Sequence, residues 1–229
     1  MFSVSPSPNA DVTRFLLLRV LWILLLVVVP AGLNGQTATD SGTFVVRHAG
    51  DTVAVERFTR GATKLEGTLQ LKNAKRTSER YSGVIAPDAS MPLLQVTVRE
   101  GVDSGMTRAR IVQRARVIFK QDSVAVDELS GAGMMTRVFE TEEGAVPYLN
   151  LSFALLEQAV RRARATPQSS KLAFFNLGGG QTLQATVSRS AGDSLTLDIG
   201  DVRYHLRVDQ AGRVLGGSIP VQNVVVERY

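Results

Sequence analysis

Few residues in this 229-residue sequence have the types and spacing that metal or thiol chemistry requires. The two histidines, His48 and His205, each lie in an alternating apolar and polar segment, and neither has a second histidine one helical turn away. The sequence contains no cysteine, which excludes thiolate metal sites, disulfides and a cysteine nucleophile together. We therefore predict no metal site, and structural or surface roles for both histidines.

Acid–base and phosphate chemistry have no stronger candidates. The pair Glu142 and Glu143 is typical of a solvated turn, whereas Glu157 lies beside an apolar stripe and could be a buried acid. Spacing identifies no partner for either, and acid–base catalysis needs paired groups. The glycine cluster at 178–180 lacks the lysine and the following helix of a phosphate-binding loop. We predict no catalytic residues and no cofactor, and we expect a non-enzymatic protein. An enzyme is the remaining alternative, and it would need a cleft with at least two converging titratable groups.

One strand-like segment carries a row of arginines. Between residues 108 and 120, four arginines share one parity of the alternation, while apolar residues share the other. In an extended strand such residues lie on one face. That face would bind phosphates, anionic head groups or an acidic partner, although it is also typical of the water-facing side of an antiparallel strand. The candidates for this anion or partner face are Arg108, Arg110, Arg114 and Arg116.

The segment 147–165 is the one with a clear helical period. Its apolar residues recur at spacings of four, three, four and three, which places them on one stripe of an α-helix. Asn150 or Ser152 can cap its start, and arginines complement its negative end. On the concave face of a sheet, this stripe is the candidate surface for a hydrophobic ligand. Its residues are Leu149, Phe153, Leu156 and Val160.

The rest of the chain from residue 43 reads as antiparallel hairpins, because β-branched and polar residues alternate between short turn signals. The clearest hairpin is 44–58, with Gly50 and Asp51 as its turn. Similar sequences recur at 187–197 and 120–126. Convergent turn chemistry or an ancestral duplication would explain this similarity. Further strands are expected at 64–72, 80–85, 93–99, 108–120, 136–141, 172–177, 202–208, 214–219 and 224–228.

The first 35 residues are typical of an export signal. Arg14 and Arg19 flank an apolar segment whose uninterrupted part, 20–29, is well short of the roughly 20 residues that span a bilayer core. Cleavage is expected after Ala31 or, preferably, after Gly35. An uncleaved anchor is the alternative. We therefore predict a periplasmic or extracellular protein with no stable membrane span after cleavage.

Size and charge limit the remaining possibilities. We predict a signal-peptide helix over 1–35 and a single β-rich domain over 36–229, which is long enough to bury its own core without staples. The formal net charge of +5 is a modest excess, and neither a polybasic tail nor a basic patch interleaved with aromatics is present. We therefore expect no nucleic-acid partner.

An export signal followed by long hairpins and a helix resembles the periplasmic half-barrels typified by the lipoprotein carriers LolA and LolB, and uncharacterised exported domains of similar build. The residues that carry the likeness are the strand, turn and strand at 202–216 and the helix at 147–165. The resemblance implies a curved sheet around an apolar cavity for acyl chains. The sequence departs from that pattern in lacking a lipobox cysteine, in having one helix and in having few aromatics, so no functional residue can be transferred.

We expect a mainly β fold, an antiparallel half-barrel or barrel of roughly ten or more strands wrapped on one amphipathic helix. The expected function is binding of a hydrophobic ligand, such as a lipid or acyl chain, or of an envelope protein partner on the concave face. The alternative is a structural or accessory cell-envelope protein with a fully packed core and no ligand. A cavity of several hundred cubic ångströms beside the helix would favour the ligand-binding function.

Overall fold

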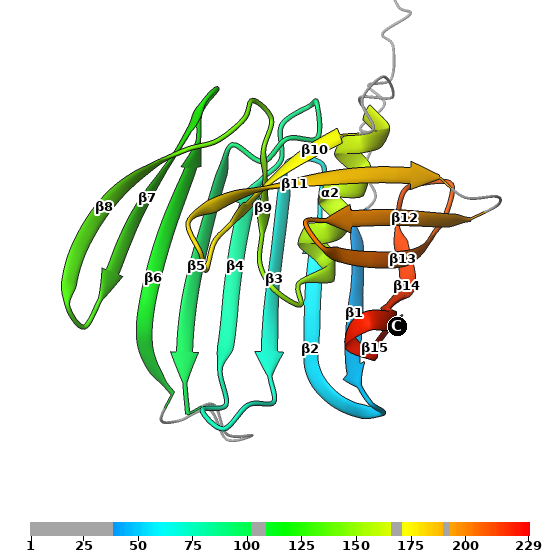
Figure 1. Ribbon diagram of the computed structural model, residues 1–229. Coiled ribbons are helices and arrows are strands. Elements are labelled where there is room, and N and C mark those ends of the chain that lie inside the picture. The colour runs from blue at the N-terminus through cyan, green and yellow to red at the C-terminus, as the bar shows by residue number, and fades with distance from the viewer. Residues whose placement is uncertain (1–38, 102–108, 166–170, 190–192) are drawn as a thin grey trace, which may run out of the picture. The chain divides into compact units, whose positions relative to one another are not determined.

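The computed structural model describes residues 39–101, 109–165, 171–189 and 193–229. The predicted signal peptide over 1–35 and Arg108 of the predicted arginine face lie outside the described residues. Within the described ranges the chain is mainly β, with fifteen strands in one sheet and one α-helix (Figure 1). No helix in this part of the chain is long and apolar enough to cross a membrane.

The strands form two groups along the chain, separated by the helix. The first group is β1 (Asp40–His48), β2 (Asp51–Arg60), β3 (Lys64–Leu71), β4 (Ser78–Val84), β5 (Leu93–Glu100), β6 (Arg110–Phe119), β7 (Ser123–Ser130) and β8 (Gly133–Glu140). The short β9 (Val146–Tyr148) leads into the helix α2 (Phe153–Ala165). The second group is β10 (Lys171–Asn176), β11 (Gln181–Arg189), β12 (Ser194–Ile199), β13 (Val202–Val208), β14 (Val214–Ile219), the single-turn 3-10 helix η1 (Pro220–Gln222) and β15 (Val224–Arg228).

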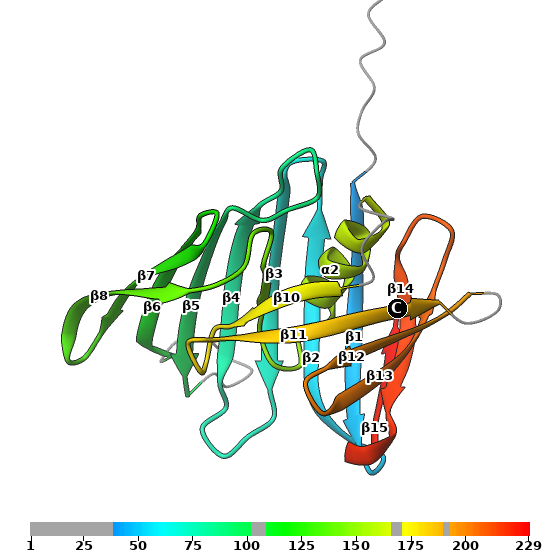
Figure 2. The same ribbon diagram turned by 45° about the horizontal axis from the view of Figure 1, so that its top comes forward.

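The chain enters the sheet in its middle. β1 pairs with β2 on one side and with the last strand, β15, on the other. From β1 the strands β2 to β8 follow in chain order to one edge of the sheet, and from β15 the strands β14 to β9 follow in reverse order to the other edge. All pairs are antiparallel except β9 with β10, which is parallel because α2 connects them as a crossover. In both views strands β10–β13 pass across the first group, with α2 between them, whereas β14 and β15 run alongside β1 (Figures 1 and 2).

The sheet is open. Its edges are β8 and β9, and no ladder joins them among the described residues. The alternative of a closed barrel is therefore wrong, and so is the expectation that every strand pair is antiparallel. Thr182 nevertheless holds edge strand β8 close to β11, because its hydroxyl donates to the carbonyl of Glu140 at 3.2 Å.

The predicted hairpins are present, with one shift at the clearest turn. His48 pairs with Asp51, so the two-residue loop between β1 and β2 is Ala49 and Gly50 rather than Gly50 and Asp51. Both loop residues have positive φ, 50° and 93°, as a type I′ hairpin turn requires. The two segments with similar sequences, 120–126 and 187–197, belong to two further hairpins, β6 with β7 and β11 with β12.

Alternation gives the first group of strands two different faces. We call the face that carries Phe44, Phe58, Leu69 and Leu94 the inner face, and the opposite face the outer face. These four side chains are at most 4% exposed and belong to a single core cluster. The buried stripe of α2, including Phe153, belongs to the same cluster. The core therefore lies between the inner face and the helix.

The helix begins later than predicted. Pro147, its expected start, lies in β9 and pairs with Phe175 of β10. Leu151 has a φ of 63°, which interrupts helical geometry immediately before the helix. Ser152, one of the two expected caps, accepts the backbone N–H of Leu155 at 3.4 Å. The described part of the helix extends to Ala165, the last described residue before the gap at 166–170.

A β-bulge divides the predicted arginine face. The β5–β6 register shifts by one residue at Val112. Arg114 and Arg116 lie on the outer face, where both are exposed. Arg110 precedes the bulge, so its parity is opposite to theirs. The prediction that Arg110 shares one row with Arg114 and Arg116 is therefore wrong.

Gly67 on β3 makes room for a side chain that spans a neighbouring strand. Tyr81 on β4 lies opposite Gly67, and its hydroxyl reaches β2, where it donates to Glu56 at 2.6 Å. A Cβ atom at Gly67 would lie 2.2 Å from Oη and 2.3 Å from Cζ of that tyrosine. The tyrosine is only 1% exposed, so its ring has no space into which to move.

We expect Gly67→Ala to lower the free energy of unfolding by about 2–4 kcal/mol, because it overpacks the core and displaces a buried hydrogen bond. Urea unfolding measures this change. Gly131→Ala is the control, since a Cβ atom there meets open space. Equal stability of the two variants would contradict the packing of Tyr81 over Gly67.

Candidate functional site

A cavity of about 360 Å³ lies on the inner face, between β4–β8 and the hairpin of β10 and β11. The sheet contributes Glu79, Val96, Val98, Gln113, Ala115, Val117, Val126, Glu128, Arg137 and Phe139. The opposite wall consists of Leu149, Phe175, Leu177, Gly178, Gly179 and Gly180. No residue of α2 lines it. The cavity therefore occupies the part of the inner face that the helix leaves uncovered.

Aromatic side chains close one side of the cavity. The rings of Phe139 and Phe175 lie 5.5 Å apart between centroids, and Phe119 meets Phe175 edge-on at 6.1 Å. The hairpin turn approaches β8 closely because Gly180 has no side chain: a Cβ atom there would lie 2.6 Å from a ring carbon of Phe139. Gly180 also has a φ of 63°, which favours glycine. This contact joins the two walls.

Polar groups lie among the apolar residues of the sheet wall. Arg137 donates to Glu128 on the neighbouring strand at 2.8 Å, and its guanidinium carbon lies 5.7 Å from the ring centre of Phe139. Oε2 of Glu79 is buried and has no hydrogen-bond partner among the described residues. Burial, followed by the charge of Glu56, raises the pKa of Glu79. The cavity thus has a mixed lining of apolar and polar groups, with one internal ion pair and one unpaired acceptor.

A buried carboxylate from β2 caps the helix. Glu56 is fully buried, and its Oε2 accepts the backbone N–H groups of Phe153 at 2.7 Å and Ala154 at 2.9 Å. Its Oε1 accepts the hydroxyls of Tyr81 at 2.6 Å and Ser152 at 2.5 Å. Burial raises the pKa of Glu56, and these four hydrogen bonds oppose the rise. The start of α2 is therefore held by a strand almost 100 residues earlier in the chain.

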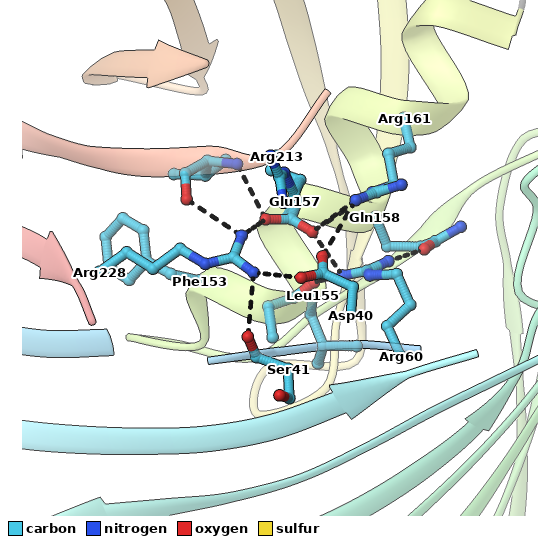
Figure 3. A network of polar contacts seen from close by, with 12 residues as sticks. Asp40, Ser41, Arg60, Phe153, Leu155, Glu157, Gln158, Arg161, Arg213 and Arg228 are labelled. Carbon is cyan, nitrogen blue, oxygen red and sulfur yellow. Dashed lines mark hydrogen bonds and ion pairs between the residues drawn. The ribbon is translucent and has the colours of Figure 1, made fainter. Parts of the chain in front are cut away.

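One turn later, Glu157 is the centre of a buried ion-pair network (Figure 3). Its Oε2 accepts Arg228 Nη1 and the backbone N–H of Val214, each at 2.8 Å. Its Oε1 lies 3.3 Å from Arg60 Nη2, and Arg228 also donates to Asp40 at 2.6 Å. These partners come from β1, β2, β14 and β15. The network therefore connects the helix to the strands where the two groups meet.

The predicted ligand stripe is divided between core and cavity. Phe153, Leu156 and Val160 are at most 3% exposed and pack in the core. Leu149 is partly buried and lines the cavity. The stripe therefore supports the helix packing, and only its first residue lies at the candidate site.

The two histidines, for which structural or surface roles were predicted, lie on the surface. His48 and His205 are both exposed, on β1 and β13. The described part of the chain contains no group of three or more histidine or acidic residues that could hold a metal ion. Neither histidine lines the cavity.

Sequence reasoning did not identify Glu56, Arg60 or Glu79 as candidates, although each broke the alternation. Glu56 and Arg60 share the parity of Ala54 and Phe58, which are buried. A charged residue at an inward-facing position indicates a buried partner, because an unpaired charge in a core is costly. The identity of that partner depends on strands far apart in the sequence, so parity alone could not supply it.

The described residues thus define an open-sheet β protein with one covering helix and an inner-face cavity. Comparison with protein-family models and with curated proteins gave no match. Among solved structures, the chain is similar to a crystal structure of a DUF1089 family protein from Pseudomonas aeruginosa, with a TM-score of 0.52 and 11% identity. The similarity covers 75% of this chain and 91% of that one. At this identity it shows a similar fold and nothing about function.

We expect Glu56→Gln to keep the fold and to flatten its dependence on pH. Glutamine reproduces the protonated acid: its oxygen can accept the two backbone N–H groups, and its amide can donate to the two hydroxyls. Because the folded protein raises the pKa of Glu56, the wild-type contribution to stability is fully present below the ordinary pKa of 4.5 and is lost as pH rises toward the folded-state value. Urea unfolding at a series of pH values above 4.5 measures this loss.

Two further variants complete the test. Glu56→Leu leaves four buried donors without an acceptor, so we expect it to lose about 3 kcal/mol or more. Glu79→Gln shows how much of the slope comes from Glu79, whose pKa shifts in the same direction. A wild-type slope that persists unchanged in Glu56→Gln would contradict the assignment to Glu56.

Proposed function

We propose that this chain is an exported, non-enzymatic module that binds an apolar or amphipathic ligand, such as a lipid or acyl chain, in the inner-face cavity. The cavity itself carries the proposal. Its volume of about 360 Å³ falls within the range of small-ligand sites, and apolar side chains, among them four valines and two phenylalanines, line it together with four polar residues. It supports ligand binding over the alternative of a structural protein with a fully packed core.

The proposal includes a half-barrel architecture, in which the inner face curves around α2 and remains partly unfilled. The helix packs mainly on β2, β9, β10 and β14, while the cavity lies over β4–β8. Such an uneven covering would leave space for a ligand without disturbing the helix network.

The polar groups of the cavity favour an amphipathic ligand. The buried Oε2 of Glu79 has no partner in the described structure, and an unpaired buried acceptor is unfavourable. A hydroxyl or amine on the ligand would supply a donor, while its hydrocarbon part lies against the valines. The ion pair of Glu128 and Arg137 supplies a second polar position.

An envelope protein on the concave face is the alternative occupant. The cavity favours a small ligand, because a stable protein interface buries about 800 Å² on each partner and needs a broader accessible surface. The apolar segment at 20–29, preceded by two arginines, supports the exported location.

We expect Ala115→Phe to weaken binding of the apolar fluorescent probe N-phenyl-1-naphthylamine by about tenfold or more, since a ring at this position fills cavity space the probe would occupy. Probe titration followed by fluorescence measures the change. Ala125→Phe on the outer face of β7 is the matched control, and its affinity should remain within about twofold of the wild type.

Native mass spectrometry of the protein purified from its own host provides the direct test. A co-purifying apolar mass that is lost in Ala115→Phe but retained in Ala125→Phe would support the proposal. Equal probe affinity in both variants, with no bound mass, would favour the structural alternative.

A further inference from the structure

The strand register assembles arginines from three strands into one row across the outer face. Cross-strand pairs link Arg57 to Thr68, Thr68 to Arg80, Arg80 to Thr97 and Thr97 to Arg114. Directly paired residues share a face, so Arg57, Arg80 and Arg114 lie on alternate strands in one line, with threonine between them. We call these three residues the arginine row. Strand spacing places them about 10 Å apart.

The arginine row is exposed and carries no ion pair among the described residues. Arg57 has only a long hydrogen bond to Gln70, at 3.4 Å. Glu66, an acid on the same face, is 2.9 Å from Lys64 instead. Some arginines elsewhere, such as Arg203, are instead paired with an acidic side chain. The row therefore presents three guanidinium groups without ion pairs in the described part of the chain, and Asp127, an acid on the same face, lies opposite Arg116 rather than opposite a residue of the row.

The row continues into an exposed apolar surface. Arg114 pairs with Leu129, and Leu129 pairs with Met134 on edge strand β8. Leu129, Met134 and the nearby Val138 are 48%, 74% and 69% exposed on this same face. We call these three residues the apolar end. In Figure 1 the strands that carry the row and the apolar end, β2 to β8, follow one another in order across the sheet.

We propose that the outer face of β2–β8 docks on an anionic lipid bilayer. The arginine row would bind phosphate groups of the head-group layer, since guanidinium groups pair with phosphate through two hydrogen bonds. The apolar end would enter the boundary between head groups and acyl chains. A purely polyanionic partner uses the positive charge but leaves the apolar end exposed to water. This inference concerns the face opposite the cavity and does not depend on the proposed ligand.

Vesicle co-sedimentation tests the proposal. The full chain is incubated with vesicles of phosphatidylcholine alone or with about 30 mol% phosphatidylglycerol, and the ratio of the two affinities is measured. The N-terminal segment, with Arg14 and Arg19, is identical in every variant, so the ratios are compared between variants rather than read alone. Arg57→Gln, Arg80→Gln and Arg114→Gln together should reduce the ratio roughly a hundredfold, since each basic side chain near an anionic surface is worth about fivefold in affinity.

The matched control removes the same charge elsewhere. Lys72→Gln, Lys120→Gln and Arg207→Gln replace three exposed cations outside the row, and the ratio should remain within about threefold of the wild type. Met134→Ser with Val138→Ser should weaken the binding that persists at about 1 M salt, where the charge contribution is screened. Far-UV circular dichroism verifies that each variant is folded.

Three results would overturn the proposal. The row variant could keep the wild-type ratio, or the control could lose as much as the row variant. The third result combines two measurements. Heparin, a polyanion without an apolar part, binds the wild type and binds the row variant more weakly, and the Met134→Ser, Val138→Ser variant binds vesicles as well as the wild type does. That last pattern would assign the face to a polyanion instead of a bilayer.

Discussion

The carboxylate of Glu56 determines where α2 begins, and the position of α2 determines which part of the sheet remains uncovered. The first N–H groups of a helix have no acceptor within the helix. Here two of them bond to a side chain of β2 rather than to a residue of the preceding loop. Glu157, one turn further along, contacts arginines of β2 and β15. One buried acid on β2 and one buried acid on the helix thus set both the rotation of the helix and its position along the sheet.

These contacts specify an arrangement more than they add stability. Moving charges out of water costs several kcal/mol per ion, and a buried ion pair recovers this cost only with good geometry and further hydrogen bonds. Arg60 shows this desolvation cost, because burial lowers the pKa of its guanidinium even though Glu157 lies beside it. Its Nη2 gains a further hydrogen bond to the carbonyl of Ala154 at 2.8 Å, while its buried Nε has no partner among the described residues. An apolar helix face alone could slide along the core, whereas these paired charges favour one register.

The alternation of apolar and polar residues predicts the bounds of those strands that are defined by nearby residues in the sequence. The strands at 202–208, 214–219 and 224–228 match their expected bounds, because alternation and turn residues define them. The three-residue β9 was missed, since its only strand partner, β10, pairs in parallel across α2. Strand order and the open edges also depend on nonlocal pairing, above all that of β1 with β15. The bulge at Val112 reversed the parity of Arg110 without a signal in residue type. The cavity could not be predicted from the stripe of α2, because it forms where the stripe is absent.

The two proposed surfaces occupy opposite faces of the same strands, and this arrangement restricts how they could cooperate. The cavity lies on the inner face of β4–β8, while the arginine row and apolar end lie on the outer face of β2–β8. A packed sheet offers no passage between its faces, so a ligand moving from a bilayer to the cavity would have to pass around an edge. The near edge is β8, where Met134 points outward and Met135, which is 52% exposed, pairs with the cavity residue Glu128. Methionine is flexible and adapts to varied apolar shapes. Two adjacent methionines at this edge would give an apolar ligand a continuous route between the two faces.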